Sequence, residues 1–203
     1  RMALKMREEG IKSNILVLGY ISPERIEQMI CLDVSLAIWT KEHIGLVEKA
    51  AANCQKPARV HLLVDSGMGR LGCHPEETLE LARLAEETDL VKLEGLFSHL
   101  AKADESDPEP TRKQEQAFLK VIDVLEKKKL MPGIIHMANS AGTLAHQETR
   151  FQLVRPGLII YGLSPSPEVQ LPAGIEPILS WKSVLASMKE LPPGHGVSYG
   201  HTY

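Results

Sequence analysis

The sequence predicts an α/β fold built on a parallel sheet, of open or barrel form. Short apolar runs alternate with helical segments along most of the chain, the pattern of βαβ units. The length of 203 residues suits an α/β barrel, which commonly fills one domain of about this size or slightly more. Six runs are strand-like, at residues 14–19, 36–40, 59–65, 91–99, 133–138 and 153–162.

The expected helices are marked by residues typical of helix ends. Residues 1–10 form an amphipathic segment that stops at Gly10, and Ser22 with Pro23 opens a short helix through Ile30. Helices are also expected at residues 41–53, 75–87 and 111–129. A chain that begins inside a helix is expected to be part of something longer.

The pattern changes after Tyr161. Prolines punctuate the next residues, Ile178–Leu191 reads as one long strand, and residues 196–200 read as the next strand or its entry. We therefore expect a barrel domain over residues 1–168 and the beginning of a β-rich domain over residues 169–203. Two strands do not make an independently stable domain.

Composition excludes several classes of function. A net charge of −3 without a basic stripe argues against nucleic-acid binding. No apolar run approaches membrane-spanning length, and the first ten residues are not a signal peptide. The three cysteines, Cys31, Cys54 and Cys73, lack metal-site spacing and are expected to be reduced thiols in a cytosolic protein.

The segment 151–162 carries Arg155 inside an apolar run, followed directly by Pro156 and Gly157. Burying a guanidinium is costly unless a planar or anionic group meets it, so such an arginine usually has a specific partner. Gly157 would let a backbone N–H approach a ligand closely, as phosphate sites require. The alternative is a strand-end arginine paired with a neighbouring carboxylate.

Other chemistry-bearing residues follow the predicted strands, and parallel sheets and barrels form their sites at the strands' carboxyl ends. Arg70 lies in a glycine-containing loop after one strand, His99 ends another, and Ser140 follows a third. With Arg155 they suit a planar, anionic, phosphorylated ligand. No carboxylate cluster or metal-ligand spacing accompanies them, so metal hydrolysis is not expected.

Each of these residues has a structural alternative. The loop glycines Gly67, Gly69 and Gly72 could be turn residues, since their spacing is neither a Rossmann fingerprint nor a P-loop. His99 could be a buried histidine with satisfied hydrogen bonds. Ser140 could cap a helix that starts at the next residue. Their convergence on one sheet edge favours the ligand site.

Five motifs occur in order and resemble one family. They are Val64–Gly72, Glu94–Asp104, His136–Ala141, Val154–Gly157 and Val197–Gly200. Together they are similar to those of alanine racemase, a pyridoxal 5'-phosphate enzyme of fold type III, over essentially the whole chain. The resemblance implies an incomplete (β/α)8 TIM-type barrel of about six strands and interconversion of L- and D-alanine by two-base proton transfer at Cα. It also implies a cytoplasmic enzyme of D-alanine biosynthesis for peptidoglycan.

The resemblance implies how the cofactor would be bound. Arg155 would face its pyridine nitrogen, and His136 would support Arg155 from behind. Ser140 would contact the phosphate, together with the backbone N–H groups of Gly157 and Leu158. Because arginine does not give up its proton, it would donate to the pyridine nitrogen and keep the ring unprotonated.

Three further residues are implied in catalysis. Arg70 would bond to the phenolic oxygen of the cofactor, and His99 would link Arg155 to Tyr199. Tyr199 would serve one face of the substrate Cα, and the cofactor-bearing lysine the other. The alternative for Tyr199 is a strand aromatic with a solvent-facing hydroxyl. In the family this tyrosine reaches the active site of the partner subunit, which implies a head-to-tail homodimer.

The chain departs from the family pattern at two places. The cofactor-bearing lysine of the family lies in a Lys-x-x-x-Tyr-Gly-His-Gly type motif. Residues 198–201 match only part of that motif, and His195 stands where its lysine would be. We therefore expect these 203 residues alone not to racemise alanine. Leu63 stands where family members often carry a lysine bonded to the nearby arginine, a bond that leucine cannot form.

Four other hypotheses remain. The first is a serine racemase of the same fold. The second is a non-catalytic barrel protein that binds pyridoxal phosphate, against which the β extension and Tyr199 argue. The third is a fold-type III decarboxylase, which normally places a carboxylate at the pyridine nitrogen. The fourth is a fragment without activity.

Overall fold

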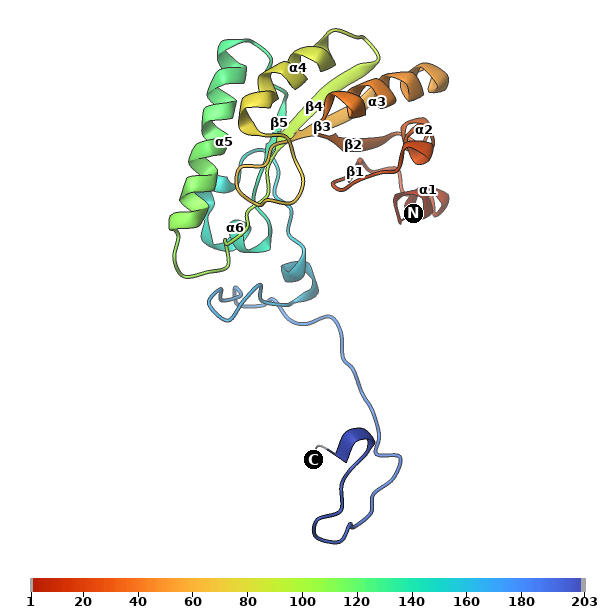
Figure 1. The fold of residues 1–203 in the computed structure, drawn as a ribbon, viewed down its shortest axis with the longest axis vertical. Helices are drawn as coiled ribbons and strands as arrows, with labels where there is room; N and C mark the ends of the chain where they lie inside the picture. The colour runs from red at the N-terminus through yellow and green to blue at the C-terminus, as the bar shows by residue number, and fades with distance from the viewer. Residues whose placement is uncertain (1, 202–203) are drawn as a thin grey trace.

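The computed structural model describes residues 2–201 and shows a curled parallel sheet with helices on its outer side (Figure 1). The sheet contains β1 (Ile15–Val17), β2 (Val34–Ile38), β3 (Ala58–Leu63), β4 (Val91–Phe97) and β5 (Ile134–His136), in that order across it. Every neighbouring pair of these strands is parallel. The predicted α/β barrel architecture is confirmed, as a five-stranded half-barrel.

Helices alternate with the strands as the sequence predicts. They are α1 (Met2–Glu8), α2 (Pro23–Cys31), α3 (Lys41–Cys54), α4 (Thr78–Glu86), α5 (Glu109–Lys127) and α6 (Ser140–Ala145). The predicted helix 75–87 is divided into a 3-10 turn, η1 (Pro75–Glu77), and α4. Thr40 caps α3 by accepting a hydrogen bond from the backbone N–H of His43, so a side chain satisfies one of the free donors of the first turn.

The main hydrophobic core lies between the sheet and its helices. All five residues of β2 are buried, as expected for a parallel strand that is covered on both faces. A second, smaller cluster on the inner face consists of Ala37, Leu63 and Phe97. Leu63 therefore packs among apolar side chains at the position where family members often carry a lysine.

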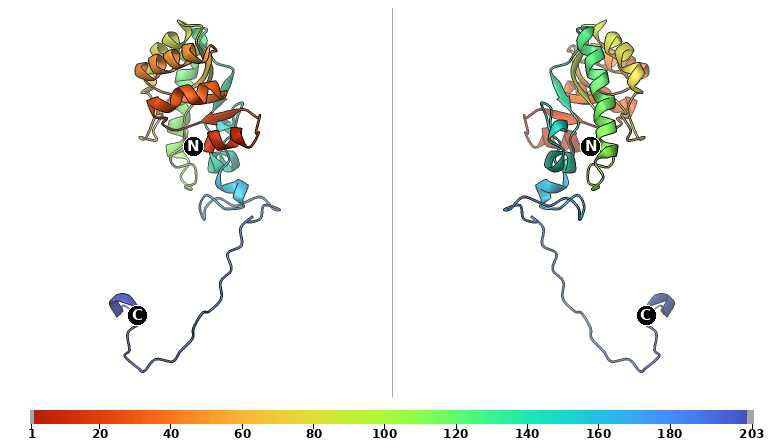
Figure 2. Two further views of the ribbon diagram at one scale, coloured as in Figure 1. Left: turned by 90° about the vertical axis from the view of Figure 1, so that its right-hand side faces the viewer. Right: turned by 90° about the vertical axis from the view of Figure 1, so that its left-hand side faces the viewer.

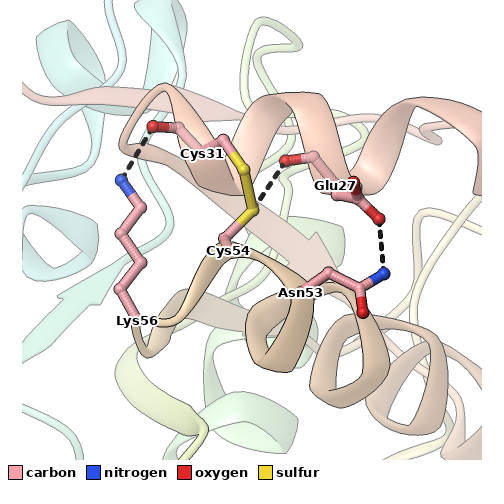
Figure 3. Close-up of a disulfide and its surroundings, with 5 residues drawn as sticks. All are labelled: Glu27, Cys31, Asn53, Cys54 and Lys56. Carbon is pink, nitrogen blue, oxygen red and sulfur yellow. Dashed lines mark hydrogen bonds between the residues drawn. A yellow bond between two sulfur atoms is a disulfide. The ribbon is translucent and has the colours of Figure 1, made fainter.

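A disulfide joins Cys31 at the end of α2 to Cys54 at the end of α3, as Figure 3 shows. The prediction of three reduced thiols is therefore wrong for this pair, while Cys73 is free and buried. The two helices follow consecutive strands and end at the same side of the sheet. Their last residues, 23 positions apart in sequence, therefore come within 5.3 Å between Cα atoms. Sequence spacing alone does not reveal such a pairing.

The sixth predicted strand does not form as a strand. Leu153 makes a single parallel bridge with His136, and residues 158–161 form a 3-10 turn, η3 (Leu158–Tyr161). Pro156 interrupts this run, and proline has no N–H to donate to a sheet ladder.

The predicted strand 178–191 is also absent. These residues have no regular secondary structure, and the segment 196–200 ends in a 3-10 turn, η4 (Tyr199–His201). Both turned views place this segment away from the barrel (Figure 2). A strand forms only where a neighbouring strand takes up its hydrogen-bonding groups, and the described residues place none beside it. Within residues 2–201 no helix is long and apolar enough to cross a membrane.

Candidate active site

Arg155 lies at the carboxyl-terminal edge of the sheet, surrounded by acceptors from two strand ends. Its Nη2 donates to the carbonyl oxygens of Ser98 and Met137, at 2.7 and 3.0 Å, and its Nη1 to Nδ1 of His136, at 2.5 Å. The guanidinium carbon lies 5.4 Å from the ring centroid of Phe97. Its partners among the described residues include no carboxylate, so the alternative of a strand-end ion pair is wrong.

One donor of this guanidinium is unused. The Nε atom of Arg155 is buried and has no hydrogen-bond partner within residues 2–201. Burial lowers the pKa of Arg155 to about 10, so the group is still charged at neutral pH. A buried, charged N–H without an acceptor is costly, because it has lost its water and gained nothing in return. The geometry is therefore suited to an acceptor supplied by a ligand.

His99 is half-buried beside this guanidinium, with its Nδ1 3.4 Å from Nη2 of Arg155. Burial, and then the charges of Arg155 and Arg70, lower the pKa of His99 to about 4, so its ring is neutral at pH 7. Gln114 of α5 holds the backbone that directly follows the side chain of this histidine. It accepts from the N–H of Ala101 at 2.8 Å and donates to the carbonyl of His99 at 3.1 Å. Sequence reasoning missed Gln114, whose only signal is a polar residue on the buried face of a helix.

Arg70 lies exposed in a loop organised by Asp65. The Oδ1 atom of Asp65 accepts hydrogen bonds from the backbone N–H groups of Gly67, Met68 and Gly69, at 2.9, 2.8 and 3.1 Å. The glycines have φ of +137° and +66°, the region that favours glycine. Gly67 and Gly69 are therefore turn residues, and the charge of Arg70 in the same loop contributes to the lowered pKa of His99.

Ser140 and Gly157 meet at the adjacent strand end. Asn139, not Ser140, caps α6, since its Oδ1 accepts from the N–H of Gly142 at 3.0 Å. The Oγ of Ser140 instead accepts from the N–H of Gly157 at 2.8 Å. A Cβ added to Gly157 would find only that Oγ within 4 Å, at 3.8 Å, so packing within the chain does not demand glycine there. Leu158 begins η3, where the first N–H groups lack intrahelical acceptors.

The structure brings most of the sequence-predicted residues together and leaves one apart. Arg155 contacts His99 and His136 directly, and Ser140 with Gly157 lies at the same edge of the sheet. Tyr199 is fully exposed in η4, in the segment that Figure 1 shows away from the barrel. The residues that converge are therefore suited to binding a ligand. Tyr199, the proton-transfer group expected from the sequence, is not part of this cluster.

Sequence reasoning also missed polar residues on the inner face of the sheet. His61 of β3 bonds to His136 and to Glu94 of β4, and Glu94 accepts from Ser35 of β2. In the sequence these residues are recognisable only as polar residues within otherwise apolar strands. Among residues 2–201 no group of three or more His, Cys, Asp or Glu side chains is placed to hold a metal ion.

Comparisons with known proteins agree on one family. The profile of the alanine racemase N-terminal domain matches residues 2–165. The alanine racemase of Symbiobacterium thermophilum is 39% identical over 198 residues, which cover 98% of this chain and 52% of that protein. The alanine racemase of Thermobifida fusca is 40% identical over 205 residues, which cover 99% of this chain and 54% of that protein.

Solved structures agree. Alanine racemase from the D-cycloserine producing Streptomyces lavendulae superimposes with a TM-score of 0.91 at 38% identity, over 99% of this chain and 54% of that one. Alanine racemase from Clostridium difficile 630 superimposes with a TM-score of 0.88 at 33% identity, over 99% of this chain and 53% of that one. The chain spans about half the length of the relatives that it matches. Since the domain profile covers most of its residues, the chain belongs to the alanine racemase family, through that family's N-terminal domain.

Proposed function

We propose that this chain is the barrel part of a pyridoxal-phosphate-dependent alanine racemase, which interconverts L- and D-alanine. The observation that carries the proposal is the buried, charged Arg155, whose Nε has no acceptor within residues 2–201. The names of its relatives support the reaction, since those proteins are alanine racemases.

The residues at the sheet edge fit the cofactor. The unpartnered Nε of Arg155 fits the pyridine nitrogen, which is an acceptor when unprotonated. The hydroxyl of Ser140 and the N–H group of Leu158 fit the phosphate, with the space beside Gly157 available to it. The N–H group of Gly157 would join them by exchanging its bond to the Ser140 hydroxyl for one to the phosphate. Arg70 fits the phenolic oxygen. When bound, pyridoxal phosphate withdraws electrons from the substrate Cα and so makes its hydrogen acidic.

The chain's own residues then orient the reaction. Arg155 keeps its proton at neutral pH, so it donates to the ring nitrogen without transferring the proton. Arg155 would thereby keep the ring a weaker electron sink than a carboxylate partner would, which suits brief proton exchange at Cα. His99, neutral and beside Arg155, would link that arginine to the proposed catalytic tyrosine, Tyr199.

We propose that Tyr199 acts as the base on one face of Cα in the partner subunit's site, within a head-to-tail homodimer. Its full exposure and its distance from its own barrel support this arrangement. Apolar side chains of the same segment are also exposed, among them Leu179, Trp181 and Val184 at 76%, 88% and 88%. Such a patch is suited to burial against another protein surface. The division into a barrel over 1–168 and a β-rich domain from 169 belongs to the same proposal.

A cytoplasmic location and a role in D-alanine supply for peptidoglycan complete the proposal. The disulfide between Cys31 and Cys54 bears on the location, since disulfides are rare in reducing cytosols. A reduced pair in cells would agree with a cytoplasmic enzyme.

The test uses the complete protein that contains this chain, incubated with pyridoxal phosphate and either enantiomer of alanine. We expect each enantiomer of alanine to be converted to the other. The kcat/KM for racemisation of alanine should be higher than that for racemisation of serine. These 203 residues alone, without the lysine that holds the cofactor, should give no exchange. A higher kcat/KM for serine would favour a serine racemase. Release of CO2 would favour a decarboxylase. Binding of the cofactor without exchange would favour a non-catalytic barrel protein. With Tyr199→Phe, proton abstraction from one enantiomer should fall much more than from the other.

A further inference from the structure

Five polar side chains form a continuous line across the inner face of the sheet. Arg155 Nη1 lies 2.5 Å from His136 Nδ1, and His136 Nε2 lies 2.8 Å from His61 Nδ1. His61 Nε2 lies 3.3 Å from Glu94 Oε2, which also accepts from Ser35 Oγ at 2.9 Å. The line runs from the candidate cofactor site through β5 and β3 to β4 and β2.

Elementary chemistry gives this line one direction. Arginine has no acceptor, so Arg155 must donate to Nδ1 of His136, which therefore carries no proton. The proton of a neutral His136 is then on Nε2 and is donated to Nδ1 of His61. That places the proton of His61 on Nε2, directed at Glu94. The carboxylate of Glu94 can only accept, so it too requires the His61 proton to be on Nε2. Arg155 and Glu94 therefore favour the same tautomers of the two histidines.

Burial keeps both rings neutral. His136 has no exposed surface and His61 is 4% exposed. Burial, followed by the charges of Arg155 and His61, lowers the pKa of His136 to about 2. Burial also lowers the pKa of His61, against the opposing effect of Glu94. In each neutral imidazole one nitrogen accepts and the other donates, so the direction of one hydrogen bond fixes the direction of the next.

A β-bulge places Glu94 in this line. The β3–β4 pairing matches Val60 with Leu93 but His61 with Gly95, so β4 contains one extra residue, Glu94. Such an insertion redirects a side chain without ending the strand. Gly95 has no side chain where the His61 ring lies, and a Cβ there would overlap that ring.

We propose that Glu94 is a positioning residue of the active site, which acts through His61 and His136 to hold Arg155 in the orientation that meets the cofactor's ring nitrogen. The inference rests on the proposed function for that last contact. The hydrogen-bond line itself stands on the geometry of the chain.

The first experiment detects the proton positions in the complete protein without cofactor. Nitrogen-15 NMR of labelled histidine rings distinguishes protonated from unprotonated ring nitrogens, and His61→Gln and His136→Gln variants assign the signals. We expect both rings to be neutral between pH 6 and 8, each with its proton on Nε2. A proton on Nδ1 of His136, or a cationic ring at pH 7, would overturn the proposal.

The second experiment uses Glu94→Gln, which keeps the shape and removes the charge, with Glu126→Gln on the exposed side of α5 as the control. The amide oxygen is a weaker acceptor than a carboxylate, and the NH2 end of the amide can face His61 instead, so the bond that holds the Nε2 proton of His61 is weakened. We expect the His61 and His136 ring signals to shift, and the Kd for pyridoxal phosphate to rise about tenfold, because hydrogen bonds to charged groups are among the stronger ones. Ring signals and a Kd like those of the control would overturn the proposal.

The two experiments separate this inference from the function on which it rests. Wild-type ring signals as expected, together with no binding of pyridoxal phosphate, would refute the cofactor site and with it the positioning role, and leave only the hydrogen-bond line. Cofactor binding together with the wrong tautomers would refute the line and leave the function.

Discussion

The hydrogen bond from Nη1 of Arg155 to Nδ1 of His136, at 2.5 Å, ties the segment after β5 to the inner face of the sheet. The His136 ring in turn stacks on Phe97, with centroids 4.6 Å apart and planes 6° from parallel. Arg155 therefore rests on a rigid aromatic support. Its Nε, which has no partner within residues 2–201, is held in place by the same contacts.

We expect Arg155→Lys to weaken binding of pyridoxal phosphate by about 10- to 100-fold, the loss of about 1.5–3 kcal/mol for a hydrogen bond to a charged group. A lysine ammonium is a single point of charge and cannot bond to His136, to two carbonyls and to a ligand at once. Titration of the complete protein with the cofactor, followed by absorbance, measures the change. Arg83→Lys on the exposed face of α4 is the control, and equal affinity in the two variants would contradict the role of Arg155.

Acid should destabilise the protein through its buried histidines. In the folded protein burial lowers the pKa of His99 to about 4 and that of His136 to about 2, from an ordinary value near 6.5. Below pH 6.5 the unfolded chain therefore binds more protons, and stability falls as the pH drops toward 4 and further. Urea midpoints at pH 7.5, 6 and 5 test this.

The His99→Gln variant should show a weaker dependence of the midpoint on pH than the wild type. His195→Gln, in the exposed C-terminal segment, is the matched control. The same dependence in wild type and His99→Gln would show that His99 titrates alike in the folded and unfolded protein.

Reduction of the Cys31–Cys54 disulfide should lower the free energy of unfolding by about 3 kcal/mol, because a loop of this length loses substantial closure entropy when cross-linked in the unfolded chain. Urea unfolding with and without dithiothreitol measures the difference. The Cys31→Ala/Cys54→Ala double variant should not respond to the reductant. A response in that variant would assign the effect to another cysteine.

We expect Gly95→Ala to destabilise the fold by about 1–3 kcal/mol, since its methyl group would displace the buried ring of His61. Gly45→Ala is an informative control, because Gly45 lies within α3 with nothing within 4 Å of an added Cβ. That change should stabilise by about 0.5–1 kcal/mol through helix propensity. Thermal or urea unfolding compares the two, and equal effects would contradict the close contact at Gly95.

Much of the barrel could be predicted from the sequence, because its strands are short apolar runs and its helices carry clear end signals. Ser22 and Pro23 open α2 where expected, and β4 ends within two residues of the predicted boundary. Whether residues 178–191 form a strand could not be predicted from those residues alone. A strand forms only when a neighbour pairs with it, and the pattern does not contain the neighbour.

The candidate site was predicted through residues at strand ends, where a polar group after an apolar run is conspicuous. Ser140 and His99 are predicted in this way, and Arg155 as a charged residue inside an apolar run. His61 and Glu94 lie inside strands, and only the curled sheet and the bulge at Glu94 bring them together. The disulfide was missed for the same reason, since the ends of α2 and α3 become neighbours only in the folded chain.

The orientation of Arg155 toward the cofactor is tested most directly by the ring nitrogen itself. The complete protein would be loaded with pyridoxal phosphate that carries nitrogen-15 in its ring, and the shift of that nitrogen recorded at pH 7. We expect the shift of an unprotonated, hydrogen-bonded pyridine, which Arg155→Lys alters and Arg83→Lys does not. The shift of a protonated pyridinium in the wild type would contradict this expectation.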